Sequence, residues 1–234
     1  MVKTILFCIL LYTINWTLRA QTVENIFSQY VNALGGQQKI DSIQTIFTES
    51  VTDVGASKKD YRKRPNLYLA YLHDSVSELT VRTCNNGALM CLSDKKMGSP
   101  DTCFKLRLLK QAKKGYSLFF NSFLEYKQLG YNIVLVGKEF IEGKECFVVK
   151  VQVNDSIYDV YYIDGLGFLP VMQQTKYASG PDGPQIYHSD YRPVDGVMFP
   201  FVEEQSGGVF KKRVFKTIKV NVPIDDGVFV CPMM

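Results

Sequence analysis

"YHSDYRPVDGVMFPFVEEQ", residues 187–205, runs from a tyrosine-rich segment through the turn "VDG" into an apolar segment that contains Phe-Pro-Phe. Two extended segments joined by so short a turn predict adjacent antiparallel strands, because parallel strands need a long crossover. Pro200 lacks a backbone N–H, so it predicts an edge strand or a bulge at that point. The stretch is therefore interpreted as one hairpin of a longer antiparallel meander.

Similar strand patterns occupy much of the chain on both sides of this hairpin. Asn86-Gly87 indicates a tight hairpin turn, because both residues tolerate a positive φ, and Glu142-Gly143 marks another. Short connections again predict up-and-down antiparallel pairing. The predicted strands lie within residues 45–54, 66–74, 77–94, 132–153, 156–164, 169–177 and 209–225.

Alternation along these strands predicts which side chains share a face. In "KECFVVKVQV", for example, Lys150 and Gln152 alternate with apolar residues. We assign the apolar parity of three strands to the concave side of the sheet. The predicted concave residues are Phe147, Val149, Val151, Tyr158, Val160, Tyr162, Ile218 and Val220.

"TVENIFSQYVNALGG", residues 22–36, has the apolar spacing of one helix face. Thr22 can cap the first turn, and Gly35-Gly36 favours a left-handed stop. "QQKIDSI" then predicts a second short helical turn, with Ile40 and Ile43 directed to the same core.

Strand alternation lapses in residues 99–131, where we predict two short helices separated by Gly115. A curved sheet needs cover for its apolar concave face, so residues 106–126 are predicted to form a lid over a cavity mouth. Leu118, Phe119 and Phe123 are expected to point toward the sheet, with Phe123→Ala weakening lipid binding more than the fold.

The composition indicates an ordinary globular protein. The chain has 234 residues, of which 46% are hydrophobic and 13% aromatic, and its net charge is +4. Scattered lysines give no case for nucleic acid. The one basic cluster, "SKKDYRKR" (57–64), is interpreted as a solvated hairpin end, the alternative being a phosphate or lipid-headgroup patch.

Residues 1–20 have the pattern of a secretory signal peptide. Lys3 precedes the apolar run "ILFCILLYTINW", and Ala20 offers a small residue at the cleavage position. An uncleaved N-terminal anchor is the alternative. We expect a soluble exported protein whose residues 21–234 form a single domain.

Export makes disulfides possible. Removal of residues 1–20 leaves five cysteines, an odd number, so at least one stays free or pairs between chains. A disulfide is expected among Cys84, Cys91 and Cys103. Neither a metal site nor a cofactor is predicted, because the cysteines and histidines lack ligand spacing.

Motifs for catalysis are also missing from the sequence: it has neither GxSxG nor HExxH. Two His-Asp pairs, His73 with Asp74 and His188 with Asp190, could exchange protons. Both are interpreted as polar residues on exposed strand faces, and the chain is predicted not to be an enzyme.

Four motifs, in order, resemble those of bacterial outer-membrane lipoprotein-sorting proteins. They are "IFSQYVNALGGQQKIDSIQTI" (26–46), "KRPN" (63–66), "DYRPVDGVMFPF" (190–201) and "KVNVPIDDGVF" (219–229). The resemblance implies a LolA/LolB-like fold, mainly β with α: a strongly curved antiparallel half-barrel, with N-terminal and mid-chain helices covering its concave face.

The resemblance also implies a periplasmic carrier that binds lipid or acylated lipoprotein cargo in an apolar cavity. We expect a monomer, with an envelope protein as a further partner. One alternative is a non-transporting envelope module that binds protein or glycan at the rim of the same fold. Another is a hydrolase that uses His188 and Asp190. Periodicity is the same whether helices and sheet pack as a solid core or enclose a cavity.

Overall fold

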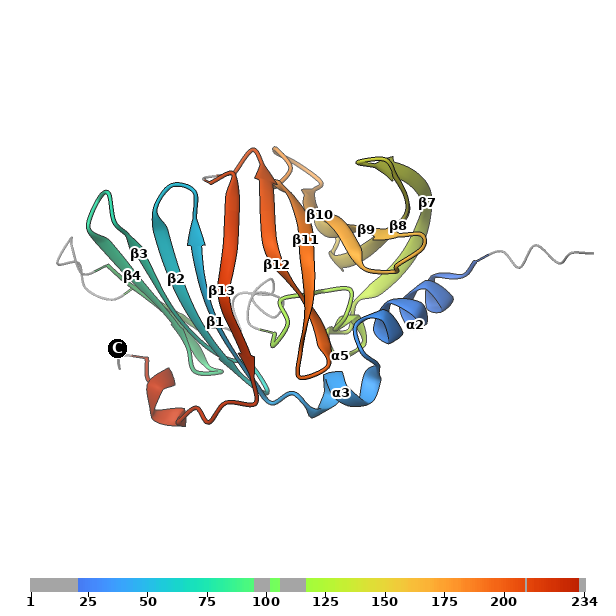
Figure 1. The fold of residues 1–234 in the computed structure, drawn as a ribbon. Coiled ribbons are helices and arrows are strands. Elements are labelled where there is room, and N and C mark those ends of the chain that lie inside the picture. The colour runs from blue at the N-terminus through green and yellow to red at the C-terminus, as the bar shows by residue number, and fades with distance from the viewer. Residues whose placement is uncertain (1–20, 95–101, 106–116, 209, 232–234) are drawn as a thin grey trace, which may run out of the picture.

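The computed structural model describes residues 21–94, 102–105, 117–208 and 210–231. In this part of the chain, thirteen strands form a single antiparallel sheet (Figure 1). The strands are β1 Thr45–Thr52, β2 Ala56–Lys63, β3 Leu67–Asp74, β4 Leu79–Asn85, β5 Leu89–Asp94, β6 Thr102–Lys105, β7 Asn132–Ile141, β8 Lys144–Asn154, β9 Ile157–Asp164, β10 Pro170–Tyr177, β11 Gln185–Val194, β12 Val197–Ser206 and β13 Lys212–Val220.

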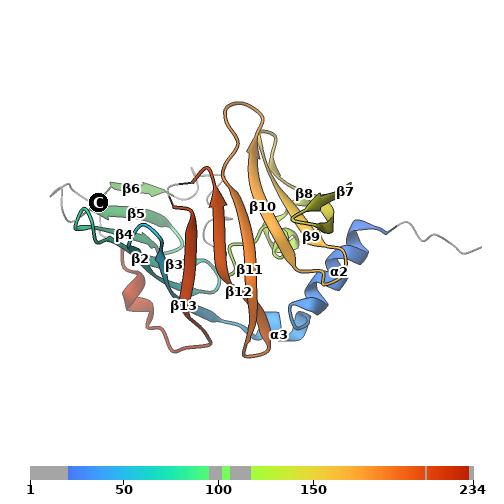
Figure 2. The same ribbon diagram turned by 45° about the horizontal axis from the view of Figure 1, so that its top comes forward.

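Two meanders meet in the middle of the sheet. The strand order is β6-β5-β4-β3-β2-β1-β13-β12-β11-β10-β9-β8-β7, so the chain runs outward from β1 to β6 and returns from β7 to β13. Pairing of β1 with β13 joins the two halves. β6 and β7 do not pair with each other, so the described sheet stays open and curved (Figures 1 and 2). The predicted curved antiparallel half-barrel is confirmed.

The predicted hairpin of residues 187–205 is formed by β11 and β12. Its turn places Asp195 at φ 51° and Gly196 at φ 77°, as a tight hairpin turn requires. Pro200 does not lie on an edge strand, however, because β12 sits between β11 and β13. The pairing of β12 with β13 covers only Val202–Glu204, so Pro200 stands where β12 has no ladder to β13.

Both N-terminal helices occur where they are predicted. Helix α2, Val23–Ala33, begins after Thr22, whose hydroxyl accepts a hydrogen bond from the Asn25 N–H at 3.2 Å. Helix α3, Gln37–Ser42, follows directly. Within the described residues, no helix is both long and apolar enough to cross a bilayer. The predicted signal peptide lies outside these residues.

The middle of the chain differs from the prediction. Thr102–Lys105 is a strand, residues 117–125 are bends and turns, and the helix α5 covers only Tyr126–Leu129. Residues 106–116 lie outside the described part. The first of the two predicted helices therefore falls largely outside the described residues, and the second is reduced to turns and one short helix.

Apolar side chains from the helices, the turn segment and one face of the sheet make the main core. We call this face, which α2 packs against, the inner face. The fully buried members include Ile26, Tyr30, Ile43, Phe123, Val149, Val151, Tyr161 and Ile163. A separate cluster lies on the outer face of β8–β10, and another lies where the 3₁₀ helix η2, Asp226–Phe229, packs on β3–β5.

The end of α2 docks directly onto the β11–β12 turn. The Met198 N–H donates to the Leu34 carbonyl at 2.9 Å. Gly35, at φ 120°, lies so close that an added Cβ would be 2.1 Å from the Gly196 carbonyl oxygen. Gly35 at the end of α2 and Gly196 in the hairpin turn therefore allow the helix end to lie in close contact with the sheet.

We predict that Gly35→Ala destabilises the protein more than Gly36→Ala. Gly36 also has a positive φ, 95°, but a Cβ there would have no atom within 4 Å. Gly36→Ala should therefore cost only the backbone strain, about 1–3 kcal/mol. Gly35→Ala adds a backbone clash, for which overpacking suggests roughly 1–3 kcal/mol more. Urea unfolding of both variants would measure this, and equal losses would contradict the docking contact.

Four cysteines gather at the β4–β5–β6 end of the sheet. Cys91 and Cys103 form a disulfide, so two of the three cysteines expected to supply a bridge do so. Cys84, the third, is a buried free thiol whose sulfur lies 2.9 Å from that of Cys231. Cys146 is a free buried thiol on β8, in the separate outer-face cluster.

We predict that oxidation of the purified protein forms a second disulfide, Cys84–Cys231, and leaves Cys146 reduced. Sulfur atoms this close need only a small movement to reach bonding distance. Non-reducing peptide mapping after alkylation in denaturant should find Cys146 as the single labelled cysteine of residues 21–234. Alkylated Cys84 and Cys231 in fully oxidised protein would show that the pair stays reduced.

Candidate functional site

A cavity of about 350 Å³ lies between the inner face of the sheet and the layer above it. The cover side of its wall is mostly apolar and includes Tyr30 of α2 and Leu34, the residue after it, together with Phe119, Phe120 and Leu124. The sheet side mixes two kinds of residue. Its apolar members include Ile46, Ile186, Val197, Phe215 and Ile218, and its ionisable members are Lys58, Asp60, Arg62, His188, Glu203 and Arg213, with Tyr191 beside them.

The basic cluster at residues 57–64 is where the structure departs most from the sequence prediction. It is not a solvated hairpin end, because it lies almost wholly in β2, an interior strand between β1 and β3. Alternation along β2 places Lys58, Asp60 and Arg62 on the inner face, in the cavity wall. A run of charged residues predicts exposure to solvent, but in the structure every second residue of this run faces the interior of the protein.

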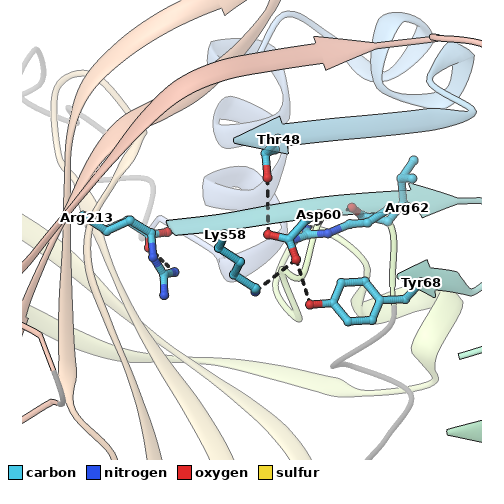
Figure 3. A network of polar contacts seen from close by, with 8 residues as sticks. Thr48, Lys58, Asp60, Arg62, Tyr68 and Arg213 are labelled. Carbon is cyan, nitrogen blue, oxygen red and sulfur yellow. Dashed lines mark hydrogen bonds and ion pairs between the residues drawn. The ribbon is translucent and has the colours of Figure 1, made fainter. Parts of the chain in front are cut away.

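Asp60 is the centre of a buried polar network (Figure 3). Asp60 is only 3% exposed to solvent. The carboxylate accepts hydrogen bonds from the Tyr68 hydroxyl at 2.7 Å and the Thr48 hydroxyl at 3.3 Å, and pairs with the Lys58 ammonium at 3.0 Å. Burial alone would raise the pKa of Asp60, but Lys58, Arg62 and Tyr68 together hold that pKa below its usual value.

Arg62 joins this network to the cover of the cavity. One terminal N–H donates to the Leu118 carbonyl at 3.3 Å, and the other nitrogen lies 4.0 Å from Asp60. The guanidinium also stacks on the Phe120 ring, 3.7 Å from its centroid. Cation–π stacking of this kind is favourable when water is excluded, so Arg62 helps to fix the turn segment over the sheet.

The charged form of Lys58 is less well stabilised than that of Asp60. Burial lowers the pKa of its ammonium, and the positive charges of Arg62 and Arg213 act in the same direction, while Asp60 opposes them. An ion pair with Asp60 therefore only partly compensates for the loss of hydration.

A second carboxylate, Glu203 of β12, lies on the same wall. It accepts a hydrogen bond from Arg213 of β13 at 3.0 Å, and the two residues are cross-strand partners. His188 of β11 has its Nδ1 atom 4.0 Å from Glu203. Burial lowers the pKa of His188, although Glu203 acts to raise it, so the imidazole is neutral near pH 7.

The interpretation of His188 as an exposed polar residue is therefore wrong, because its side chain is only 9% exposed and lines the cavity. The hydrolase alternative also loses its pair. Asp190 is bound by Arg192 through two hydrogen bonds, of 2.9 and 2.6 Å, on the exposed side of the strand. His73 contacts Thr80 at 3.1 Å and lies outside the cavity wall.

The residues predicted to line a lipid cavity fall into three groups. Phe119 and Ile218 line it. Leu118, Phe123, Phe147, Val149, Val151 and Val220 belong to the adjacent main core. Tyr158, Val160 and Tyr162 lie on the outer face, where they pack with Val148 and Met172. The register explains the error, because inner-face Val149 pairs with Tyr161 and Val151 with Asp159.

Phe123 in particular is not a lid residue. It is fully buried, and its ring contacts those of Phe27, Tyr30 and Tyr161 at centroid distances of 5.5, 5.1 and 5.7 Å. Phe123→Ala should therefore behave as an ordinary core truncation, for which a typical loss is about 3–5 kcal/mol. Phe119, whose ring lies 6.3 Å from that of Phe199 on β12, takes the place at the wall.

The sequence held a signal for the ionisable wall. In "SKKDYRKR" an acidic residue stands two positions from a basic residue on either side, which is the spacing of one strand face. Within the described residues, no group of three or more His, Cys, Asp or Glu side chains is arranged to hold a metal ion.

No protein-family model matches the sequence, and no curated protein matches it either. Solved structures do match. A DUF1329 family protein from Desulfovibrio piger aligns with a TM-score of 0.59 and 13% identity, over 90% of this chain and 98% of that one. A LolA superfamily protein from Nitrosomonas europaea aligns with a TM-score of 0.55 and 13% identity, over 90% and 98%.

An outer membrane lipoprotein-sorting protein domain from Vibrio parahaemolyticus, described as putative, also aligns. Its TM-score is 0.55 and its identity 11%, over 87% of this chain and 94% of that one. At this identity the likeness concerns the fold. The chain thus has a LolA/LolB-like fold, as its four sequence motifs indicate.

We predict that Asp60→Asn destabilises the protein by about 3–5 kcal/mol, because removing one partner of a buried charge network leaves the others uncompensated. Glu49→Gln is the matched control: Glu49 pairs with Lys59 across the same two strands, but on the exposed face. It should change the free energy of unfolding little. Urea denaturation measures both, and a loss for Asp60→Asn no larger than the control would contradict the network.

The pH dependence of stability gives a second test, in which the parent protein is compared with Asp60→Asn. Because folding lowers the pKa of Asp60, its contribution to stability is present above the unfolded value of 3.8 and is lost as the pH falls through the folded pKa. The stability difference between parent and Asp60→Asn should therefore be constant near neutral pH and shrink in acid.

Proposed function

We propose that the protein is a non-catalytic binder of lipid or lipoprotein acyl chains, and that it holds one apolar chain in the inner-face cavity. It acts in the periplasm, as a monomer, after removal of residues 1–20, with residues 21–234 as a single lipid-binding domain. The observation that carries this proposal is the cavity itself. Its volume of about 350 Å³ lies within the roughly 300–1,000 Å³ range of small-molecule pockets.

The construction of the wall supports an apolar occupant. Aromatic residues from the two sides of the cavity, Phe119 of the turn segment and Phe199 of β12, both line it, with their ring centroids 6.3 Å apart. A chain inserted between cover and sheet would contact Leu34, Ile46 and Ile218 without displacing the main core.

The fold neighbours are consistent with this role. One of them is described as a lipoprotein-sorting domain and another as a LolA superfamily protein. Transport, as distinct from binding, requires a protein that delivers the cargo and another that accepts it. An envelope protein is accordingly proposed as a further partner.

A second candidate function is recognition of an envelope protein at the surface without transport. Strand β7 favours it, because it is a described sheet edge and exposes Val134, Val136 and Phe140, the last at 73%. Unpaired edge strands can bind an extended segment of a partner by strand addition. A protein of this kind would not need to hold lipid.

We predict that Ile186→Trp weakens binding of a neutral single-chain lipid at least about tenfold, whereas Tyr187→Trp does not. Ile186 lines the cavity, so a larger side chain there occupies space that the ligand needs. Tyr187, the next residue of β11, packs on the outer face. Calorimetric titration with 1-monolauroylglycerol measures the effect, and thermal unfolding of both variants controls for misfolding.

Native mass spectrometry of protein purified from the periplasm complements the titration, since a carrier should retain lipid. If the parent protein neither retains lipid nor binds monolauroylglycerol, the carrier proposal is wrong. If both variants bind as the parent does, lipid is bound somewhere other than the inner-face cavity.

A further inference from the structure

The charges in the cavity wall do not balance. Of the described residues that line the cavity, three are basic, Lys58, Arg62 and Arg213, and two are acidic, Asp60 and Glu203. His188 is buried there in its neutral form. One excess positive charge thus remains in a partly enclosed space, where a charge without a partner is costly.

The hydrogen bonds show the same imbalance. Asp60 already binds Thr48, Tyr68 and Lys58, and Glu203 binds Arg213. The donors are less well satisfied. Among the described residues, the Nε–H groups of Arg62 and Arg213 have no acceptor, although both nitrogens are buried. Lys58 has three N–H groups. Its ammonium forms an ion pair with Asp60 and lies 5.9 Å from the centroid of the Tyr68 ring.

Two of the three basic residues lie toward one end of the cavity. Lys58 pairs with Ser50 and Arg213 with Thr52, so both lie toward the β1–β2 turn. The apolar residues Ile46 and Ile218 lie further along the same strands, and Leu34 and Val197 lie where α2 meets the β11–β12 turn. Lys58 and Arg213 therefore mark one end of the wall, whereas Arg62, which pairs with Ile46, lies beside the apolar residues, where the Leu118 carbonyl and the Phe120 ring hold its guanidinium.

We propose that this cavity selects an amphiphile with a single anionic head, a phosphate or a carboxylate, which contacts Lys58 and Arg213 while the apolar chain lies toward Ile46 and Ile218. The inference rests on the proposed function, because it assumes that an acyl chain occupies the cavity. An anionic oxygen would accept hydrogen bonds from the unused N–H groups of Lys58 and Arg213. Such charge-assisted hydrogen bonds are stronger than neutral ones.

The position of Asp60 and Glu203 is compatible with this assignment. Each carboxylate holds a basic side chain in place, Lys58 or Arg213, at 3.0 Å. Held in this way, the cations lose little further side-chain entropy when the ligand arrives. The Arg213 guanidinium is also stacked on the Phe210 ring, 4.4 Å from its centroid. The two cations at this end of the cavity are thus held in place by the protein itself.

The test compares three ligands by calorimetric titration of the mature chain, with lipids below their micellar concentrations. Dodecyl phosphate supplies the anionic head and the chain, 1-monolauroylglycerol supplies a chain with a neutral head, and inorganic phosphate supplies the anion alone. We expect dodecyl phosphate to bind at least about tenfold more tightly than monolauroylglycerol, and inorganic phosphate to bind more weakly than either.

Two variants and two matched controls locate the effect. Lys58→Gln and Arg213→Gln should each reduce the affinity for dodecyl phosphate about tenfold more than the affinity for monolauroylglycerol. Lys59→Gln changes the next residue of β2, which pairs with Glu49 on the other face. Arg192→Gln removes an exposed, similarly paired arginine. Neither control should alter the preference.

Arg213→Lys retains the charge and should keep most of the preference, which separates loss of charge from loss of structure if Arg213→Gln folds poorly. Equal affinities for the two lipids would overturn the head-group proposal while leaving the proposed lipid-binding function intact. Binding of neither lipid would defeat the proposed function itself. Inorganic phosphate bound as tightly as dodecyl phosphate would show a site for free anions and overturn the amphiphile assignment.

Discussion

The structure depends on one constraint: the inner face of an open, curved sheet needs a cover for its apolar side chains. In the described part of the chain, that cover consists of α2, α3, the turns of 117–125 and α5. These elements lie mainly over β7–β9, where the main core forms. Toward the centre of the sheet, Phe120 of the turn segment reaches Arg62 of β2 and Tyr68 of β3. The cavity and the Asp60 network lie there.

Much of the fold was predictable because it is determined locally. The hairpin turns at Gly87, Gly143 and Gly196 need a positive φ, and α2 has an N-terminal cap and a glycine stop in its own sequence. Sidedness was predictable only where one face is polar. In "SIYDVYYID" both faces of β9 are apolar, and the informative residue, Asp159, is misleading because it is buried on the inner face with Ser122 and Thr175. The sequence alone does not distinguish an aspartate that is buried with hydroxyl partners from one that is exposed to solvent.

The candidate site was less predictable than the fold, for a related reason. Its charged residues come from β2, β12 and β13, which lie on the same part of the sheet only because β1 pairs with β13. No local pattern indicates that Lys58 and Arg213, 155 positions apart in the sequence, will share one wall. The mid-chain aromatics present the opposite problem. The spacing of Phe119 and Phe123 fits a helix, yet residues 117–125 form bends and turns, and the helix begins only at Tyr126.

The two carboxylates also set a limit on how tightly such a cavity can hold an anion. They neutralise most of the cationic charge in the empty state, which keeps a cluster of basic groups from repelling one another in a poorly hydrated space. The same carboxylates repel an arriving anion, so the net attraction corresponds to about one charge rather than three. A carrier has to release its cargo as well as bind it, and moderate electrostatic attraction combined with an apolar wall is consistent with reversible binding. A wall with three uncompensated cations would bind an anionic head more strongly, but it would destabilise the empty protein and slow release.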